Sequence, residues 1–442
     1  MMASILIKNA CLLPIDESMS IIEDGWIHIE GSTILALGTG MPPQVDGAAV
    51  IDVDGDVVMP GMVNPHAHLA MTLFRGLGED VDDRLFRYVL PMERKFVTPE
   101  MVRVGTLLGA LESIEAGVTT IADMYYYETE VGRALDQAGL RGVVGQTLAT
   151  FDPPDQRTMD EGFALVEKLV AEFSGHDRII PSIAPHAPYS TDVATMARVA
   201  RWAEAHPGVP VQLHLAEMDS EMEWCRKHHG LRPVAVVEKA GLLINGLIAA
   251  HCLHIDPFEI ERMAKADVRV AHNARSNAKA GRGIAPIEAM RAAGIKVGIA
   301  TDGPMSGNTL DLFSQFGPVS MFQKLLGHSR KPMPAAQVIR MATLEGAQVL
   351  GLDRRIGSLE PGKQADLIRI NLSAPRLQPV YDIYATLVFS GMPVDVQDVM
   401  VGGRWIMRGR NVESLERRKI LRDAGQIATA FKAEMAKIDA AG

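Results

Sequence analysis

The strongest constraint on the fold is an alternation of two sequence textures between residues 58 and 358. Short runs of β-formers, such as VTTIAD at 118–123, are separated by longer segments with helical periodicity, such as MVRVGTLLGALESIEAG at 101–117. Strands that alternate with helices are typical of parallel βαβ units. About 240 residues lie between Gly61 and Asp302, close to the ~250 of an eightfold barrel. We therefore predict an α/β fold of the (β/α)8, or TIM barrel, type. The alternative, an open doubly wound sheet, gives no reason for polar residues to converge from many strand ends.

The alternating region has β-rich sequence on both sides. Residues 1–57 contain short runs of β-formers between Gly, Asp and Pro, and residues 359–412 return to the same texture. We expect the two flanks to form one small sheet domain, and 58–358 to form the catalytic barrel. In residues 413–442 apolar side chains recur at helical intervals, which predicts a terminal amphipathic helix.

Composition argues against several classes of protein. The net charge of −10 disfavours binding to nucleic acid or to an anionic membrane, because both need a basic patch. No segment approaches the ~20 apolar residues of a membrane span, and the start of the chain lacks the pattern of an export signal. Cys11, Cys225 and Cys252 are far apart and form no CxxC pair, which fits a reducing compartment. We expect a cytoplasmic protein.

Four polar side chains near predicted strand ends form a candidate metal site. His66 and His68 end the apolar run VVMPGMVNP, and positions two apart on a strand face the same side. His214 ends the run VPVQLH. Asp302 follows KVGIAT, and its carboxylate can bind an ion, accept a proton from bound water, or do both. Alone, each would more often be a structural residue held by hydrogen bonds. Because the carboxyl ends of barrel strands meet at one face, the four together predict a site for one divalent ion and hence a metal-dependent hydrolase.

Glu217 and His251 add candidate catalytic groups to this site. A divalent ion lowers the pKa of bound water from about 15.7 to about 7. Glu217 lies three residues beyond His214, where a carboxylate that is not a ligand can carry the proton to the substrate. The alternative is a solvated loop glutamate. His251 ends the run GLIAAH, from which it can orient the attacking water.

Five segments of the chain resemble those of a known family: PGMVNPHAHLAMTLFRG, HLAE, AAHCLHID, AHNARSN and TDG. They are similar to the amidohydrolase superfamily, in the aminohydrolase branch that includes methylthioadenosine/S-adenosylhomocysteine deaminases, guanine and cytosine deaminases, and triazine hydrolases. The resemblance covers nearly the whole chain and implies a distorted (β/α)8 barrel beside a small β-sandwich. It implies one Zn²⁺, or Fe²⁺ in some members, with Glu217 as proton shuttle and His251 assisting the attacking water. The implied metal ligands are His66, His68, His214 and Asp302.

Two further segments resemble substrate-binding parts of nucleoside deaminases. LPMERKFVTPEMV at 90–102 resembles the segment whose glutamate, here Glu93, binds both ribose hydroxyls, and a carboxylate can accept two such hydrogen bonds. The alternative for Glu93 is a charge partner of Lys95. APHAPYS resembles the substrate-side histidine loop of the family, which implies that His186 binds the ribose or the purine ring.

Two loops depart from the family pattern. Ala274 stands where the family commonly has proline, and 279–283 replaces a Leu-Ala-Ser-Gly run. Residues 304–308 read Pro-Met-Ser-Gly-Asn instead of Ala-Ala-Ser-Asn-Asn. Both loops lie at the mouth of the site in the family, so they bear on substrate choice. The candidates for an arginine that would bind a homocysteine carboxylate are Arg141, Arg157 and Arg178, and each has an ordinary surface charge as its alternative.

The predicted activity is hydrolytic deamination of an aminopurine, foremost an adenosine-type nucleoside such as 5'-methylthioadenosine, S-adenosylhomocysteine or adenosine. One alternative is an aminohydrolase of another heterocycle: guanine, a pterin, cytosine or an s-triazine. The alternative from another class is a non-catalytic barrel that serves as a scaffold, for which loss of metal ligands would be the expected mark. The resemblance also implies a homo-oligomer.

Overall fold

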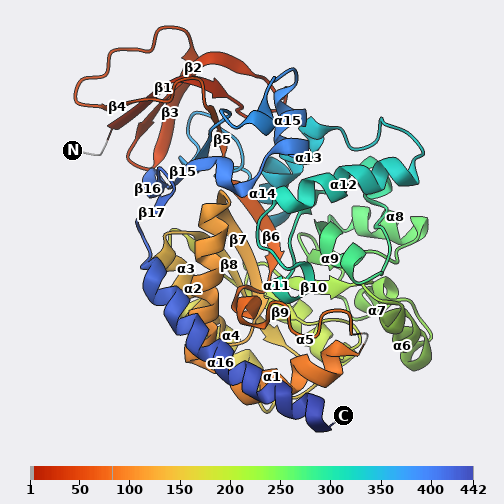
Figure 1. Ribbon diagram of the computed structural model, residues 1–442. Helices are drawn as coiled ribbons and strands as arrows, with labels where there is room; N and C mark the ends of the chain where they lie inside the picture. Colours follow the sequence, from red (N-terminus) through yellow and green to blue (C-terminus); the bar gives the residue numbers. More distant parts are fainter. Residues whose placement is uncertain (1–3, 82, 442) are drawn as a thin grey trace.

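The computed structural model describes residues 4–81 and 83–441 of the chain, which form a mixed α/β fold (Figure 1). Its middle strands lie in two parallel four-stranded sheets with the orders β6-β7-β8-β9 and β10-β11-β12-β13. Spatial order follows chain order, as expected for successive βαβ units. The strands are β6 (Met62–Ala67), β7 (Val118–Tyr125), β8 (Arg141–Leu148), β9 (Ile179–Pro185), β10 (Gln212–Leu215), β11 (Ile248–His251), β12 (Arg269–His272) and β13 (Val297–Ile299).

Backbone hydrogen bonds also connect the two parallel sheets with each other. Ile183 in β9 forms a parallel bridge with Val211, which directly precedes β10. At the opposite edges, the N–H of Asp302, beyond the end of β13, donates to the carbonyl oxygen of His66 in β6 over 3.1 Å. The carboxyl ends of strands from both sheets therefore lie close together, where their side chains can share one site.

Helices follow most of these strands along the chain. The longest in the central region is α2 (Pro99–Glu115), which begins after Thr98, whose side chain accepts a hydrogen bond from the N–H of Met101. The other helices up to β13 are η1 (Leu69–Phe74), η2 (Leu85–Val89), α1 (Leu90–Phe96), α3 (Glu128–Ala138), α4 (Met159–Phe173), α5 (Val193–Ala205), α6 (Asp219–His229), α7 (Pro233–Lys239), α8 (Pro257–Lys265), α9 (Ala274–Lys279) and α10 (Ile287–Ala292). Those after β13 are α11 (Pro304–Gly307), α12 (Phe313–Leu326), α13 (Ala335–Ala342), α14 (Leu344–Leu350), η3 (Pro375–Leu377), α15 (Ile383–Ser390), η4 (Pro393–Asp395) and α16 (Arg417–Ala441).

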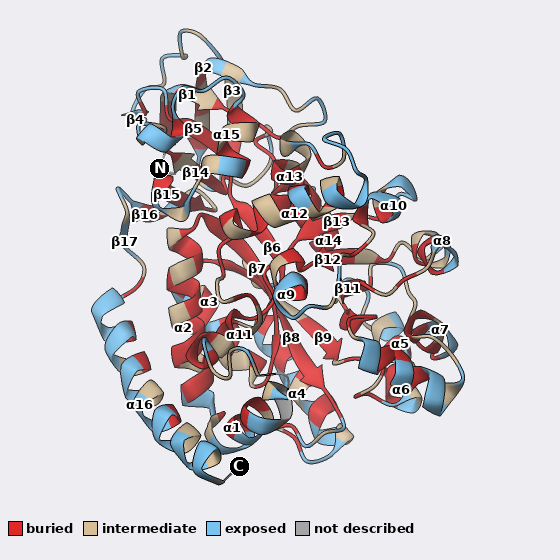
Figure 2. Ribbon diagram, turned by 45° about the vertical axis from the view of Figure 1, so that its right-hand side comes forward, coloured by how far each residue is buried: buried red, intermediate tan, exposed pale blue. Residues whose placement is uncertain are grey.

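The central strands are covered on both faces. Every residue of β7 and of β8 is buried, and Figure 2 shows these strands in the middle of the molecule. Parallel sheets need this cover, which is why their strands appear in the sequence as nearly continuous apolar runs. Polar side chains within such strands are therefore buried as well, and each needs a partner or a function.

A nine-stranded sheet is assembled from both ends of the chain. Its order is β17-β16-β15-β14-β5-β1-β2-β3, and β4 pairs with β1. Figure 1 shows this sheet at the top of the molecule, with the N-terminal and C-terminal segments side by side. The strands are β1 (Ser4–Leu12), β2 (Ile22–Glu30), β3 (Thr33–Thr39), β4 (Ala49–Asp52), β5 (Val57–Pro60), β14 (Leu367–Ile370), β15 (Val396–Val401), β16 (Arg404–Arg408) and β17 (Asn411–Val412).

Gly61 joins the nine-stranded sheet to the central region. It is the single residue between β5 and β6. A Cβ atom built on Gly61 would lie 2.2 Å from the side-chain atoms of Thr119 in β7. Only glycine therefore lets the chain pass from one sheet to the other this close to β7.

The C-terminal helix α16 lies along the outside of the central region (Figure 1). Phe431 is buried, and its ring centroid lies 4.9 Å from those of Phe74 and Phe96. The helix thus ties the end of the chain to η1 and α1. Among the helices of residues 4–81 and 83–441, none is long and apolar enough to cross a membrane.

Candidate active site

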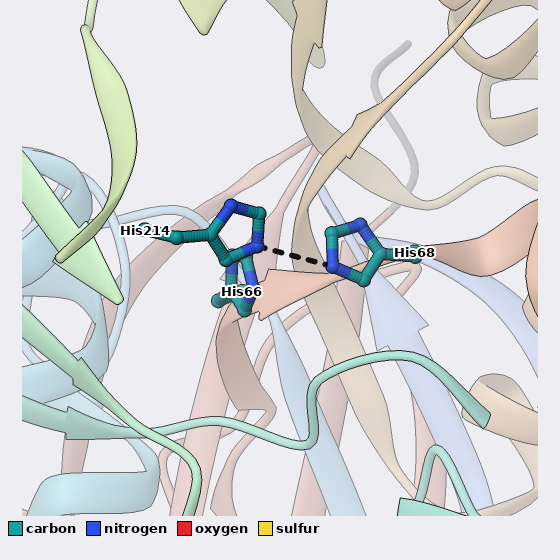
Figure 3. A group of neighbouring side chains, drawn as sticks. All are labelled: His66, His68 and His214. Carbon is teal, nitrogen blue, oxygen red and sulfur yellow. Dashed lines mark hydrogen bonds between the residues drawn. The ribbon is translucent and has the colours of Figure 1, made fainter. Parts of the chain in front are cut away.

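Three histidines from two strands meet at the carboxyl end of the central strands (Figure 3). His66 lies in β6, His68 directly follows it, and His214 lies in β10. One ring nitrogen from each lies within 4.8 Å of the others. The two Nε2 atoms of His68 and His214 face each other over 3.4 Å. Since His66 and His68 are two residues apart, the period of the strand brings both rings to this point.

A second group joins His66 to His251, at the end of β11, and to Asp302 under the same 4.8 Å limit. Asp302 Oδ1 lies 3.3 Å from His68 Nε2 and 3.9 Å from His66 Nε2. The four predicted metal ligands thus lie together. Because His251 belongs to this second group, it is a candidate ligand in addition to its predicted role at the water.

These residues fit a divalent cation. His66 is 1 % exposed, and its Nε2 has no hydrogen-bond partner among the described residues. A buried ring nitrogen without a partner is costly unless something binds it. Imidazole nitrogens together with one carboxylate oxygen are a donor set that zinc favours.

Hydrogen bonds on the outer side of the rings hold the candidate ligands in place. His68 Nδ1 lies 2.5 Å from the carbonyl oxygen of Met124, and His214 Nδ1 lies 2.9 Å from that of His186. An Nδ1–H that donates to a carbonyl leaves the Nε2 lone pair free for a metal. Ser276 donates to Asp302 Oδ2 over 2.5 Å, and the N–H of Gly303 donates to Oδ1 over 2.7 Å.

The protonation of the cluster follows from burial and from Asp302. Burial, reinforced by the charge of His68, lowers the pKa of His66 well below its usual value and that of His214 to about 4. Both rings are therefore neutral at pH 7, as ligands must be. Burial also opposes the charging of His68, but the hydrogen bond that its ring donates to Asp302 outweighs burial and raises the pKa of His68 to about 9. A bound cation would take the place of that ring proton.

The backbone turns sharply where the site residues leave their strands. Ala216, His251 and Asp302 have φ angles of 51°, 72° and 62°. This left-handed region is costly for residues with a Cβ, and such residues concentrate at functional sites. Here the turns direct side chains from three strand ends towards the common site.

Glu217 lies beside the histidine cluster and contacts two basic side chains. Its Oε1 accepts a hydrogen bond from Arg282 and lies 3.6 Å from His251 Nε2. Burial opposes ionisation of Glu217, but His251 and Arg282 outweigh burial and lower its pKa. The carboxylate of Glu221 accepts the backbone N–H groups of Ala216 and Glu217 over 3.0 and 2.7 Å. Glu221 thereby fixes the turn that presents Glu217.

Glu93 and His186 line the same cavity, which has a volume of about 390 Å³ and is also lined by His68, His214, Glu217, His251 and Asp302. Glu93, in α1, accepts a hydrogen bond from Tyr125 over 2.7 Å, and burial raises its pKa to about 7. His186 Nδ1 lies 2.6 Å from Ser190 Oγ. Seven of the eight predicted side chains of the site thus line one cavity, and the eighth, His66, lies beside them in the histidine cluster.

The three arginines considered as candidates for a substrate carboxylate do not line this cavity, so the alternative of an ordinary structural or surface charge holds for them. Arg141 is buried in an ion pair with Asp366 at 3.1 Å, and Arg178 pairs with Asp136. Arg157 is exposed on the surface. The arginines that do line the cavity are Arg84 and Arg282.

Sequence reasoning missed four residues that contact the predicted ones: Tyr125, Ser276, Asn277 and Arg282. Ser276 and Asn277 belong to the motif AHNARSN, so the motif held a signal for them. Arg282 lies in the loop that departs from the family pattern, which marked its place but not its contact. Nothing in the sequence pointed to Tyr125 as the partner of Glu93.

Comparison with known proteins gives consistent matches. A model of the amidohydrolase family matches residues 57–406. A 5-methylthioadenosine/S-adenosylhomocysteine deaminase from Syntrophus aciditrophicus is 36% identical over 427 residues, which is 96% of each chain. A protein of the same name from Moorella thermoacetica is 37% identical over 423 residues, 95% of this chain and 97% of that one.

Solved structures agree in fold. The zinc-bound structure of an adenosine deaminase from Xanthomonas campestris is 30% identical, with a TM-score of 0.94 over 98% of this chain and 99% of that one. The zinc complex of an atrazine chlorohydrolase from Arthrobacter aurescens TC1 is 22% identical, with a TM-score of 0.89 over 96% of this chain and 100% of that one. The second likeness is one of fold alone.

Proposed function

Because the chain belongs to the amidohydrolase family, we propose that it is a zinc-dependent hydrolytic deaminase of an adenosine-type nucleoside. The substrates proposed are 5'-methylthioadenosine, S-adenosylhomocysteine and adenosine. One observation carries this proposal. Glu217, a carboxylate suited to moving protons, lies in one cavity with the histidine cluster and with Glu93, a carboxylate suited to a diol.

The proposed reaction replaces the amino group of the purine ring with oxygen. Water adds to the ring carbon that bears the amino group, the bond from that carbon to nitrogen breaks, and ammonia leaves. His66, His68, His214 and Asp302 would hold a divalent cation, which would supply an activated water nucleophile and stabilise developing negative charge.

The protein's own acid–base groups move the protons. Glu217 takes a proton from the attacking water and passes it to the ring nitrogen beside the reacting carbon. Its lowered pKa keeps the resting carboxylate charged and ready to accept that proton. Asp302 carries the second proton to the departing ammonia, and His251, held by Asn277 over 2.9 Å, orients the water.

Two further side chains support the choice of a nucleoside. Glu93 would accept hydrogen bonds from both ribose hydroxyls, and the Tyr125 hydroxyl already held on its Oε1 fixes the direction of the carboxylate. His186 would contact the ribose or the purine ring. A cavity of about 390 Å³ falls within the range of small-molecule sites.

The proposal extends to the architecture. The hydrogen bonds that link the two parallel sheets support a closed but distorted (β/α)8 barrel over 58–358. The nine-stranded sheet, which includes β5 as far as Pro60, supports one small β domain built from both ends of the chain. We propose it as the β-sandwich expected over 1–57 and 359–412, extended to Pro60, with 413–442 as a terminal helical segment. Cytoplasmic location and a homo-oligomeric state stay predictions from the sequence.

A substrate screen tests the proposal. Zinc-loaded protein is incubated with adenosine, 5'-methylthioadenosine, S-adenosylhomocysteine, guanine, cytosine, a pterin and melamine, and ammonia release is measured. Turnover of the three nucleosides is expected. Activity on free bases alone would remove Glu93 as a ribose-binding residue, and absence of turnover on every compound would overturn the deaminase.

A further inference from the structure

Helix α9 and the turn after it contact three of the proposed catalytic groups. Ser276 donates to Asp302 over 2.5 Å, Asn277 Oδ1 lies 2.9 Å from His251 Nδ1, and Arg282 donates to Glu217. These contacts come from residues 274–283, which we call the α9 segment. One short element thus touches every proposed acid–base group of the site.

The α9 segment is anchored at several points. The N–H of Arg282 donates to the carbonyl oxygen of Asn277 over 3.0 Å, which folds the turn back onto the helix. Lys279 Nζ contacts Glu79 at 2.6 Å and Asn308 Oδ1 at 2.6 Å. The turn passes through Gly281, with a φ of 66° that glycine adopts readily. Arg282 therefore projects from a fixed backbone.

The contact of Arg282 involves only one oxygen of Glu217. Arg282 Nη1 and His251 Nε2 both approach Oε1. Among the described residues, no hydrogen bond to Oε2 is found, so this oxygen is available to a substrate in the cavity that Glu217 lines. A guanidinium is planar and rigid, so it holds a carboxylate in a defined direction better than an ammonium does.

We propose that Arg282 is a positioning residue, which holds Oε1 of Glu217 so that Oε2 points to the ring nitrogen of the substrate. This inference rests on the proposed role of Glu217 as the proton shuttle. In this proposal Arg282 acts through Glu217, whose carboxylate its Nη1 contacts, and not as a binding group for the substrate. The interaction therefore affects the chemical step more than the binding of the substrate.

Steady-state kinetics of Arg282→Met and Arg282→Lys test the proposal. Methionine keeps much of the length of the side chain but cannot donate. A displaced catalytic group costs up to about 10²-fold in rate, so kcat of Arg282→Met should fall by about 10- to 100-fold with KM within about threefold. Lysine should restore part of kcat. An unchanged kcat in Arg282→Met, or a raised KM at unchanged kcat, would overturn the positioning role.

Two controls separate positioning from a general structural effect. The first control is Arg275→Met, which makes the same change of side chain in the α9 segment but outside the cavity lining. Its kcat should stay within about twofold of the wild-type value. In Arg282→Ala, millimolar guanidinium should restore several-fold activity, while it should not stimulate the wild type. Absence of rescue would count against the proposal, because it would show that the loss of activity does not come from the missing guanidinium group alone.

Crystal structures of the wild type and Arg282→Met give a readout apart from activity. The carboxylate of Glu217 should leave its position in the variant, with zinc content and the site histidines unchanged. If Glu217 stays in place, the positioning role is wrong whatever the substrate is. If instead the wild type deaminates nothing while Glu217 moves in the variant, the proposed function fails and the positioning of Glu217 stands.

Discussion

At the scale of single residues, the site is governed by what surrounds each carboxylate. Glu217 and Glu93 are both buried glutamates in one cavity. The basic neighbours His251 and Arg282 lower the pKa of Glu217, whereas burial without a basic contact raises that of Glu93 to about 7. Environments that push two carboxyl pKa values apart are typical of sites in which each has its own task.

Glu217→Gln should abolish most turnover without loss of the metal. The amide keeps the size of the side chain but cannot accept the proton, and general acid–base groups contribute about 10²- to 10⁴-fold. Ammonia release and zinc content are measured on the same preparation. A fully active variant would remove Glu217 from the mechanism, and a variant without zinc would make it a structural residue.

The pKa of Glu93 near 7 predicts a pH-dependent affinity for the ribose. The charged carboxylate accepts two hydroxyl hydrogen bonds and the protonated form accepts fewer, so KM for adenosine should rise as the pH falls below about 7. In Glu93→Gln, KM should be high and independent of pH over this range. The range from about pH 6 to about pH 8 spans about 1 unit on either side of this pKa. A wild-type KM that stays constant over this range would contradict the role of Glu93.

The same shift predicts the sign of a stability change. The folded state keeps a proton on Glu93 that the unfolded chain releases from its ordinary pKa of 4.5 upwards. Stability from this group is therefore full below pH 4.5 and declines up to pH 7, by about 3 kcal/mol at most. Urea unfolding at both ends of this window should show a smaller decline for Glu93→Gln. An equal decline in stability in the wild type and in Glu93→Gln would show that the proton taken up on folding is not bound by Glu93.

At the scale of elements, short connections fix the geometry of the site. β5 and β6 are joined by Gly61 alone, and β6 carries His66. The α9 segment likewise fixes Asp302, His251 and Glu217, through contacts from Ser276, Asn277 and Arg282. Precise placement of the catalytic groups thus depends on packing at residues that do no chemistry.

Gly61→Ala should destabilise the fold and disturb the histidines. Its Cβ would meet the Thr119 side chain at 2.2 Å, and overpacking of this kind costs about 1–3 kcal/mol. Chemical denaturation measures the loss. Thr119→Ala removes the two nearest atoms, so the double variant should recover part of the stability; if it is no more stable than Gly61→Ala, the clash is not the cause.

At the scale of the whole molecule, the buried histidines couple the metal to stability. Four of them, His66, His68, His214 and His251, crowd together with Asp302. A ligand that binds only the folded state stabilises it by mass action, by about 4 kcal/mol at a thousandfold excess over Kd. The molecule should therefore be most stable when loaded.

Removal of the metal with a chelator should lower the melting temperature and abolish turnover, and added zinc should restore both. Differential scanning calorimetry of chelated and reloaded protein measures the change, with metal content determined in parallel. Two ions per chain in the loaded protein would contradict a mononuclear site, and a melting temperature unaffected by loading would contradict a cation among the buried histidines.

Much of the site was predictable because strand ends in parallel sheets share an edge. The family match confirms the resemblance that the motifs around His66, His214 and Asp302 indicate, and the structure brings these residues together as expected. The catalytic roles of Glu217 and His251 stay predictions. The sequence could not decide the role of the candidate arginines, because charge pairing depends on residues far away in sequence: Arg141 meets Asp366, 225 positions on.

The sequence by itself predicted the class of fold, the family and four candidate metal ligands, because all three depend on local periodicity and on motifs within a few residues. Only the tertiary structure decided which side chains surround those groups. Arg282 meets Glu217 across 65 positions and Tyr125 meets Glu93 across 32, and no local pattern specifies either contact. They arise from packing of the whole chain, and they set the charge and direction of the two glutamates on which the chemistry depends.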